Sequence, residues 1–474
     1  MFLQLKICRR IYCLSAAICF PMLFTRSCLI LLLFNMAAPW HVGKAQTNSP
    51  ALALKARTGN PYYLKQSPAS EFAHVYLLIQ VTAPAATAQS FRTPVNIAMV
   101  LDRSKSMRGA KLQFAKEAAH YVIDRLNKND RIAIIAYDDV VQLVSPAKPV
   151  KNKQKLKKRV NSIEFNGNTN LSDGLFAGYE QVQTFYADGY VNRLLLLSDG
   201  LANKGITNRF LLMDTARRVN QNSHVTLSTF GLGAGFDEDL LEWLADWGGG
   251  NYYFIEKARK IPTVFKQELQ EMQQVCIQQC RVEMPVPQNW QVVKVFGSPY
   301  TQKDNTLYLD FDDVFAGQTK TALIQLQMPP TETSTLQLPL YCTYLQLPEA
   351  QLQQAAIQLP LQATANTTQY LAAFDSTVLS HIVLFETNQK LYNAIAIADG
   401  GNYDASGIAA TQLLNQLQAQ LLLYPTDAML KKQFDLVHNY IGQLALAAQY
   451  NEYQQKMMQK NAKHDNYRIR KKRK

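Results

Sequence analysis

Two kinds of hydrophobic pattern divide the chain. Between residues 96 and 276, unbroken apolar runs alternate with stretches whose apolar residues recur at helical spacing, and the runs at 95–101 and 194–197 are the clearest. Unbroken runs of this kind are typical of parallel strands buried on both faces. Repeated strand–helix alternation therefore predicts a doubly wound α/β domain over 96–276, with a mainly parallel sheet.

A period-two pattern flanks this region. Apolar and polar residues alternate in three later segments, 290–296, 306–311 and 321–327. Such alternation predicts half-buried antiparallel strands, so residues 277–365 are predicted to form a β-sandwich. The same alternation occurs at 71–84, within the N-terminal segment 46–95. Because a lone strand is not stable by itself, we expect it to pair into the sandwich, which makes the α/β domain an insertion within one β-domain.

The last third of the chain has helical spacing. Three segments carry apolar residues three and four positions apart, at 374–398, 403–422 and 426–448. We interpret residues 366–459 as a helical hairpin region that buttresses the sandwich. Residues 460–474 are polar and basic and have no apolar face, so they are predicted to form a disordered tail.

The amino end is typical of an export signal. Basic residues precede apolar runs at 11–24 and 28–34, and small and polar residues follow. Neither run reaches the roughly 18 apolar residues that a membrane span requires. We predict a signal peptide over 1–45, an exported protein that is periplasmic, on the cell surface or secreted, and no transmembrane segment after signal removal. Both Met1 and Met22 are suitable starts for this signal.

The formal net charge of +13 is concentrated at the two ends. Residues 1–45 contribute five positive charges and no acid, and residues 461–474 contribute a net of six, which leaves +2 for the body. The body lacks a basic stripe with interleaved aromatic residues, so no nucleic-acid partner is predicted. The basic tail has two interpretations, contact with an anionic envelope surface or a merely solvated terminus.

Three cysteines remain after signal removal, Cys276, Cys280 and Cys342. No His or further Cys near the first two completes a zinc site. In an oxidising compartment a disulfide between Cys280 and Cys342 is the preferred pairing, and three buried, reduced cysteines are an equally good interpretation.

Oxygen-bearing side chains follow the apolar run at 95–101. Asp102, Ser104 and Ser106 occupy alternate positions of one short loop, which can turn all three toward one point. Hard oxygen ligands outside the carboxyl end of a strand suit Mg²⁺, and open α/β sheets bind ligands in that crevice. Two further oxygen-bearing residues occur at matching points downstream. Thr169 lies in a Gly/Asn-rich loop before a helix-like run, and Asp199 follows the apolar run at 194–197.

These pieces resemble the von Willebrand factor type A (vWA) domain family and its metal-ion-dependent adhesion site. The family pattern is Asp-x-Ser-x-Ser, then a loop Thr, then a strand-end Asp. The resemblance covers about residues 96–275, and the segment 248–253 looks like the secreted bacterial branch. It implies a Rossmann-like fold and a site for Mg²⁺, or for Mn²⁺ or Ca²⁺, with the aspartates acting through water. The implied metal ligands are Asp102, Ser104, Ser106, Thr169 and Asp199.

The implied ligand set favours binding over catalysis. Mostly neutral direct ligands leave the ion's charge under-compensated on its open side, so the ion attracts a carboxylate from outside. Nothing nearby supplies a nucleophile–base pair, so no enzymatic activity is predicted. We expect an exported protein that mediates Mg²⁺-dependent interaction or adhesion by binding an acidic side chain of a partner protein.

The alternative is a structural or assembly scaffold of the cell envelope with a degenerate metal site. Lys105 motivates this alternative, because the family commonly has Gly or another small residue at this position. An ammonium beside the ion would weaken cation binding by electrostatic repulsion.

Overall fold

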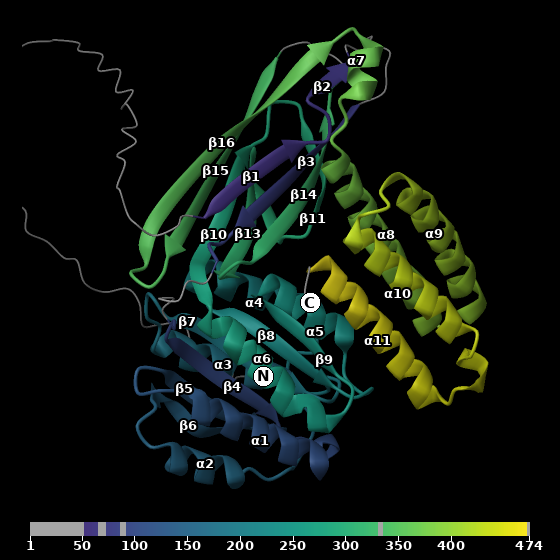
Figure 1. Ribbon diagram of the computed structural model, residues 1–474. Coiled ribbons are helices and arrows are strands. Elements are labelled where there is room, and N and C mark those ends of the chain that lie inside the picture. Colours follow the sequence, from purple (N-terminus) through teal and green to yellow (C-terminus); the bar gives the residue numbers. More distant parts are fainter. Residues whose placement is uncertain (1–51, 65–72, 86–91, 330–334, 472–474) are drawn as a thin grey trace, which may run out of the picture. The chain divides into compact units, whose positions relative to one another are not determined.

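The computed structural model describes residues 52–64, 73–85, 92–329 and 335–471 (Figure 1). The predicted signal peptide over 1–45 lies outside the described residues. Within the described part, the strands form a mainly parallel six-stranded sheet and two antiparallel sheets of four and six strands, the latter with one short parallel pair at its edge. This arrangement, followed by a helical region, confirms the predicted fold class.

The mainly parallel sheet has the strand order β6-β5-β4-β7-β8-β9. Its strands are β4 Val95–Asp102, β5 Arg131–Tyr137, β6 Val141–Pro149, β7 Val191–Ser198, β8 Thr226–Leu232 and β9 Gly249–Ile255. All neighbours pair in parallel except β6, which is antiparallel to β5 at the edge. The associated helices are η1 Lys105–Met107, α1 Ala110–Arg125, α2 Lys153–Asn161, α3 Leu171–Thr184, α4 Arg209–Ser223, α5 Glu238–Trp247, η2 Ala258–Lys260 and α6 Ile261–Gln273.

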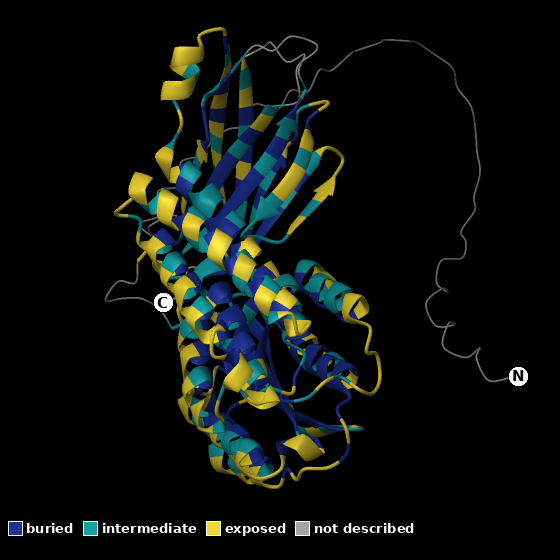
Figure 2. Cartoon of the chain, turned by 90° about the vertical axis from the view of Figure 1, so that its right-hand side faces the viewer, coloured by how far each residue is buried: buried dark blue, intermediate teal, exposed yellow. Residues whose placement is uncertain are grey.

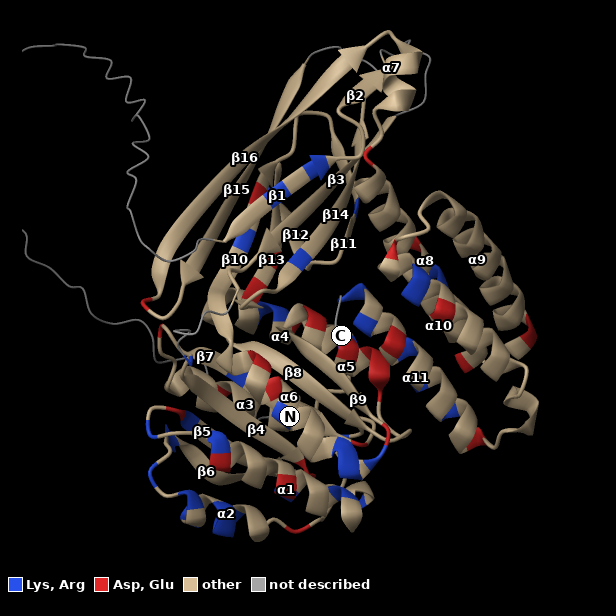
Figure 3. Cartoon of the chain, viewed as in Figure 1, with Lys and Arg blue, Asp and Glu red and all other residues tan. Residues whose placement is uncertain are grey.

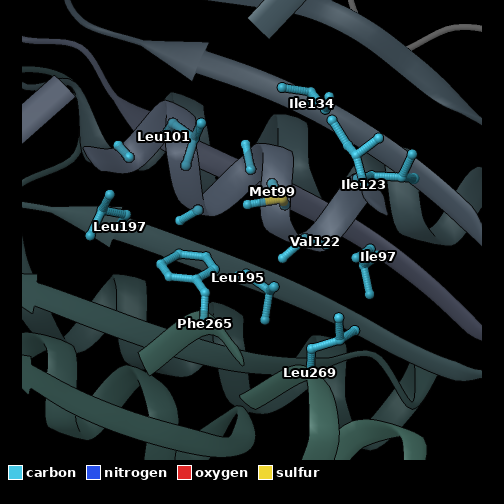
Figure 4. Close-up of a cluster of buried hydrophobic side chains, with 14 of the residues drawn as sticks. Ile97, Met99, Leu101, Val122, Ile123, Ile134, Leu195, Leu197, Phe265 and Leu269 are labelled. Atoms are coloured by element: carbon cyan, nitrogen blue, oxygen red, sulfur yellow. The ribbon is translucent and has the colours of Figure 1, made fainter. Parts of the chain in front are cut away.

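Both faces of this sheet are covered, which explains the unbroken apolar runs. On one face, Met99 of β4 and Leu195 of β7 pack with Val122 of α1 and Phe265 of α6 (Figure 4). The alternate residues of the same strands pack against α3, α4 and α5 in a second cluster. Every residue of β4 and β7 is therefore buried.

The two antiparallel sheets form the predicted sandwich around one hydrophobic core. One sheet has the order β1-β3-β14-β11, with β1 Ala53–Thr58, β3 Ala73–Thr82, β14 Thr319–Met328 and β11 Gln291–Phe296. The other has the order β12-β13-β10-β15-β16-β2, with β12 Tyr300–Lys303, β13 Thr306–Phe315, β10 Val275–Pro285, β15 Leu336–Gln346, β16 Gln351–Thr364 and β2 Tyr62–Leu64. Buried residues alternate with intermediate or exposed ones along several of these strands, such as β10 and β15 (Figure 2).

The expected pairing of the early strand is confirmed. Strand β3 pairs antiparallel with β14 along its whole length, from Ala73 opposite Met328 to Thr82 opposite Thr319. Its inward side chains Leu77 and Ile79 are fully buried in the sandwich core. The α/β domain is thus inserted between two sequence parts of one β-domain.

A buried ion network joins the inserted domain to the sandwich. Arg193 of β7 contacts Glu268 of α6 and Asp313 of β13, each at 2.8 Å. Burial alone would lower the pKa of Arg193, but the two carboxylates hold it above its ordinary value. Breaking such a buried network by removing one partner is strongly destabilising, so these contacts keep the two domains in one arrangement.

The C-terminal region is helical. It comprises α7 Thr367–Ala372, α8 Ser376–Asp399, α9 Tyr403–Leu423, α10 Ala428–Leu444, η3 Ala447–Gln449 and α11 Glu452–Arg470. Helices α8 to α11 share one hydrophobic cluster. Within the described part, none of the helices combines the length and the apolarity that a bilayer span demands.

The prediction of a disordered tail over 460–474 is wrong for the described residues, because α11 continues to Arg470. This helix lies against α5 through opposite charges (Figure 3). Lys463 Nζ contacts Glu238 at 2.5 Å, and Arg470 contacts Asp246 at 2.8 Å. The pattern missed this contact because the α11 residues that pair with α5, Lys463 and Arg470, are basic and their partners on α5 are acidic. The same helix also buries four apolar residues, Met457, Met458, Ala462 and Tyr467.

Two of the three cysteines lie side by side in the sandwich core. The sulfur atoms of Cys280 and Cys342 are 3.8 Å apart, and both residues, like Cys276, are free thiols. The pair preferred from the sequence is therefore adjacent. Cys280 and Cys342 are buried, as the reduced alternative expects, whereas Cys276 is only half-buried.

Lys463→Ala should lower the free energy of unfolding by about 3 kcal/mol, as expected when one partner of a buried ion pair is removed. The Lys463 side chain is 5 % exposed and its Nζ also contacts Asp399 at 2.5 Å. Lys456→Ala is the matched control on the same helix, because this 54 % exposed lysine pairs with exposed Glu452. The control should lose less than about 1 kcal/mol. Urea denaturation followed by fluorescence measures the free energy of unfolding of both variants. Equal losses would contradict a stabilising role for the buried ion pairs of Lys463.

Candidate metal centre

Asp102 ends β4, and its carboxylate is fully buried beneath the following loop. Its Oδ1 accepts a hydrogen bond from Ser104 N at 2.8 Å, and its Oδ2 accepts one from Ser198 Oγ at 2.9 Å. Burial raises the pKa of Asp102 to about 6, because desolvation of the carboxylate outweighs the bonds from Ser104 and Ser198. Tyr137 OH lies 3.4 Å from the same Oδ2. These partners fix the carboxylate so that it faces the loop.

The two serine hydroxyls lie next to each other. Ser104 Oγ and Ser106 Oγ are 3.0 Å apart, and Ser106 Oγ donates to Asp199 Oδ1 at 2.6 Å. Two ligands at right angles around Mg²⁺, each about 2.1 Å from the ion, are about 3.0 Å apart. The serine pair therefore fits neighbouring positions of an octahedral shell. Ser104 is buried and Ser106 is exposed, so the pair borders the solvent.

Thr169 comes from a separate loop and faces Ser106 across Gly200. A β-carbon on Gly200 would lie 3.1 Å from Thr169 Oγ1 and 3.7 Å from Ser106 Oγ, so both hydroxyls border the same small space. Asn203 holds the threonine in place, because its Oδ1 accepts a bond from Thr169 N at 3.0 Å and its N donates to Thr169 O at 3.2 Å. The absence of a side chain at Gly200 leaves this space open.

The five predicted ligands thus gather at one edge of the parallel sheet, and their assignment as metal ligands stays a prediction. No group of three or more His, Cys, Asp or Glu side chains in the described residues is placed to hold a metal. The candidate centre instead offers two carboxylates and three hydroxyls. This donor set suits a hard cation.

A lysine already contacts this centre. Lys111 Nζ, from the first turn of α1, is 2.5 Å from Asp199 Oδ2. Lys105, by contrast, has an exposed side chain, and its backbone N donates to Gly167 O at 3.2 Å. The ammonium that competes with a cation for Asp199 therefore belongs to Lys111. Sequence reasoning missed it because Lys111 lies outside the motif, although its position on the first turn after the loop was the available signal.

Arg103 points away from the centre. Its guanidinium contacts Asp138 at 3.0 Å and Gln142 at 2.7 Å, which ties the loop to the β5–β6 hairpin. Its carbonyl accepts a bond from Asn166 N at 2.8 Å, so the loop is also tied to the segment that carries Thr169. The three loops of the candidate centre are thus held together by contacts that do not need a metal.

Residues 96–267 match the family model of the von Willebrand factor type A domain. This match and the doubly wound sheet show that residues 96–267 form a vWA domain. The chain is similar to YfbK of Escherichia coli, an uncharacterized protein, with 26% identity over 260 residues that cover 53% of this chain and 45% of YfbK.

Other curated relatives match shorter parts of the chain. An uncharacterized protein of Synechocystis is 32% identical over 184 residues, which cover 39% of this chain and 43% of that protein. Inter-alpha-trypsin inhibitor heavy chain H4 of Bos taurus is 28% identical over 168 residues, or 33% of this chain and 18% of that protein. The chain spans less than half the length of each of these relatives.

Two solved structures share the fold over most of the chain. A von Willebrand factor type A protein from Catenulispora acidiphila has a TM-score of 0.66 at 15% identity, covering 82% of this chain and 90% of that one. The ArnB paralog VWA2 from Sulfolobus acidocaldarius has a TM-score of 0.60 at 15% identity, covering 88% of this chain and 99% of that one. The likeness in fold therefore extends beyond the vWA domain itself.

Proposed function

We propose that this protein mediates Mg²⁺-dependent interaction or adhesion by binding a carboxylate of a partner protein. Ser104, Ser106 and Thr169 would hold the ion directly, and Asp102 and Asp199 would orient its water. The observation that carries this proposal is the 3.0 Å separation of the two serine hydroxyls beside the Thr169 hydroxyl. When bound, the ion supplies an electrophilic face for an acidic side chain, and Mn²⁺ or Ca²⁺ are substitutes with the same ligand preference.

The burial of the two aspartates supports a binding role. Asp102 and Asp199 are both buried and hydrogen-bonded, which suits carboxylates that orient the water of a bound ion. The hydroxyls that border the solvent are neutral and leave the ion's charge available for a ligand. We therefore propose a non-enzymatic role. We also propose that a signal peptide at 1–45 exports the protein to the periplasm, the cell surface or the medium.

A metal-independent envelope scaffold is the second candidate, and one contact favours it. The Lys111 ammonium neutralises Asp199, a residue whose side chain is fully buried. With this ion pair in place, the buried carboxylate has a cationic partner without any metal. The two candidates differ in whether a divalent cation displaces the ammonium from Asp199.

Asp102→Ala should weaken Mg²⁺ binding at least about tenfold, because the variant removes the buried charge that orients the ion's water. Isothermal titration calorimetry of the purified protein with MgCl₂ measures the affinity. Asp124→Ala is the control, because this half-exposed acid pairs with Lys157 at the far end of α1. Identical titrations of the wild type and the Asp102 variant would remove the metal-dependent proposal.

Lys111→Ala should raise the Mg²⁺ affinity roughly fivefold, because it removes a like charge worth about 1 kcal/mol at such a site. Lys105→Ala should change the affinity by less than about twofold, since its side chain is exposed. The same calorimetric titration compares both variants with the wild type. Stronger Mg²⁺ binding by the Lys105 variant alone would show that Lys105, and not Lys111, opposes the cation. No Mg²⁺ binding by any variant would favour the scaffold.

A further inference from the structure

A second charged feature covers the corner formed by β6 and α2, outside the candidate metal centre. Figure 3 shows several lysine and arginine positions on α2. Residues 148–159 contain seven cations and no acid: Lys148, Lys151, Lys153, Lys155, Lys157, Lys158 and Arg159. The nearly neutral charge of the body as a whole conceals this local concentration.

Helical spacing separates these cations into two stripes. Lys153 and Lys157, four positions apart, both reach α1, where Lys153 Nζ donates to Asp124 O at 2.8 Å and Lys157 Nζ lies 2.6 Å from Asp124 Oδ2. These two lysines therefore have a structural role, since they hold α2 against the end of α1.

The other stripe borders a groove of about 310 Å³. Four cations line it, Lys148 from β6, Lys151, and Lys155 and Arg159 from α2, beside Pro149, Asn152 and Leu156. No salt bridge joins any of these four to a carboxylate of the described residues, and Arg159 contacts Ser145 Oγ at 3.4 Å. We name this feature the α2 groove.

The α2 groove is electrostatically unfavourable without a ligand. Like charges four positions apart on a helix repel each other, and this applies to Lys155 and Arg159 of α2. Lys151 lies just before the helix. The first turn of α2 also contains no acid, although the helix dipole favours one there. A multivalent anion in the groove would relieve this repulsion, because all four cations face the same space.

We propose that the α2 groove binds a phosphate-bearing anion. Lysine and arginine are the residues that bind phosphate oxygens, and four of them suit a ligand with more than one negative charge. Leu156 and Pro149 add an apolar surface beside the cations. The same chemistry would serve a phospholipid headgroup or a soluble phosphate compound.

The basic tail is a weaker candidate for this contact. Its described cations Lys463 and Arg470 already face Glu238 and Asp246 of α5. Those two charges are neutralised within the molecule, whereas the cations of the α2 groove form no salt bridge with the described residues. We therefore place the proposed anionic contact at α2 rather than at these two residues.

The test compares two double variants with the same change in charge. Lys151→Glu with Lys155→Glu alters the groove, and Lys55→Glu with Lys303→Glu alters exposed positions of β1 and β12. Binding is measured by cosedimentation with vesicles of phosphatidylglycerol and phosphatidylcholine, and by calorimetry with inorganic pyrophosphate. EDTA is present throughout, so that no cation at the candidate metal centre bridges to phosphate. Circular dichroism checks that each variant is folded.

We expect the groove variant to bind at least about tenfold more weakly and the control variant to stay within about threefold of the wild type. Weaker binding of both ligands by the groove variant supports a groove that accepts any phosphate. Weaker binding of vesicles alone supports a lipid headgroup as the ligand, and weaker binding of pyrophosphate alone supports a soluble phosphate compound. Equal weakening in both variants, or no wild-type binding to either ligand, overturns the proposal. The Asp102→Ala variant should bind vesicles and pyrophosphate as the wild type does, so this test is independent of the proposed metal-dependent function.

Discussion

Strands β4 and β7 have no solvent-exposed face, and this constraint positions the candidate metal centre. A polar side chain inside such a strand needs a buried partner, as Asn96 and Asn192 show by their 2.9 Å hydrogen bond. Polar ligands for a solvent-facing site can therefore appear only where the strands end. Because parallel strands end at the same edge, Asp102 and Asp199 come together there although 97 positions separate them.

The fold was predictable wherever burial followed hydrophobicity. The alternation at 71–84 was enough to expect a strand of the later sandwich, and its pairing with β14 follows from the need to cover an apolar face. The tail was not predictable in this way, because the contact of α11 with α5 depends on charge as well as on apolar packing. Complementarity between Lys463 and Glu238 depends on two segments far apart in the chain, and no periodicity within either segment reveals it.

The candidate site was predictable only for residues that belong to a motif. Asn203 acts through its position in space, and its spacing in the sequence carries no pattern that marks it. The signal for Lys111 was its place in the first helical turn after the loop, outside the motif. The α2 groove was missed for another reason. A net charge summed over the body cancels its cations against acids elsewhere, such as those of α5, so only the local sequence over 148–159 reveals the excess.

The inserted domain has its two chain connections at the edge opposite the candidate centre. Thr93, just before β4, donates to Val275 O at the start of β10 at 2.7 Å, so the entry and exit of the domain meet. Arg193, near the beginning of β7, joins the sandwich at the same end. A pull on a partner held at the far edge would thus run lengthwise along the central strands and load their hydrogen bonds together in shear. Such a route resists mechanical tension better than one that peels the strands apart one bond at a time.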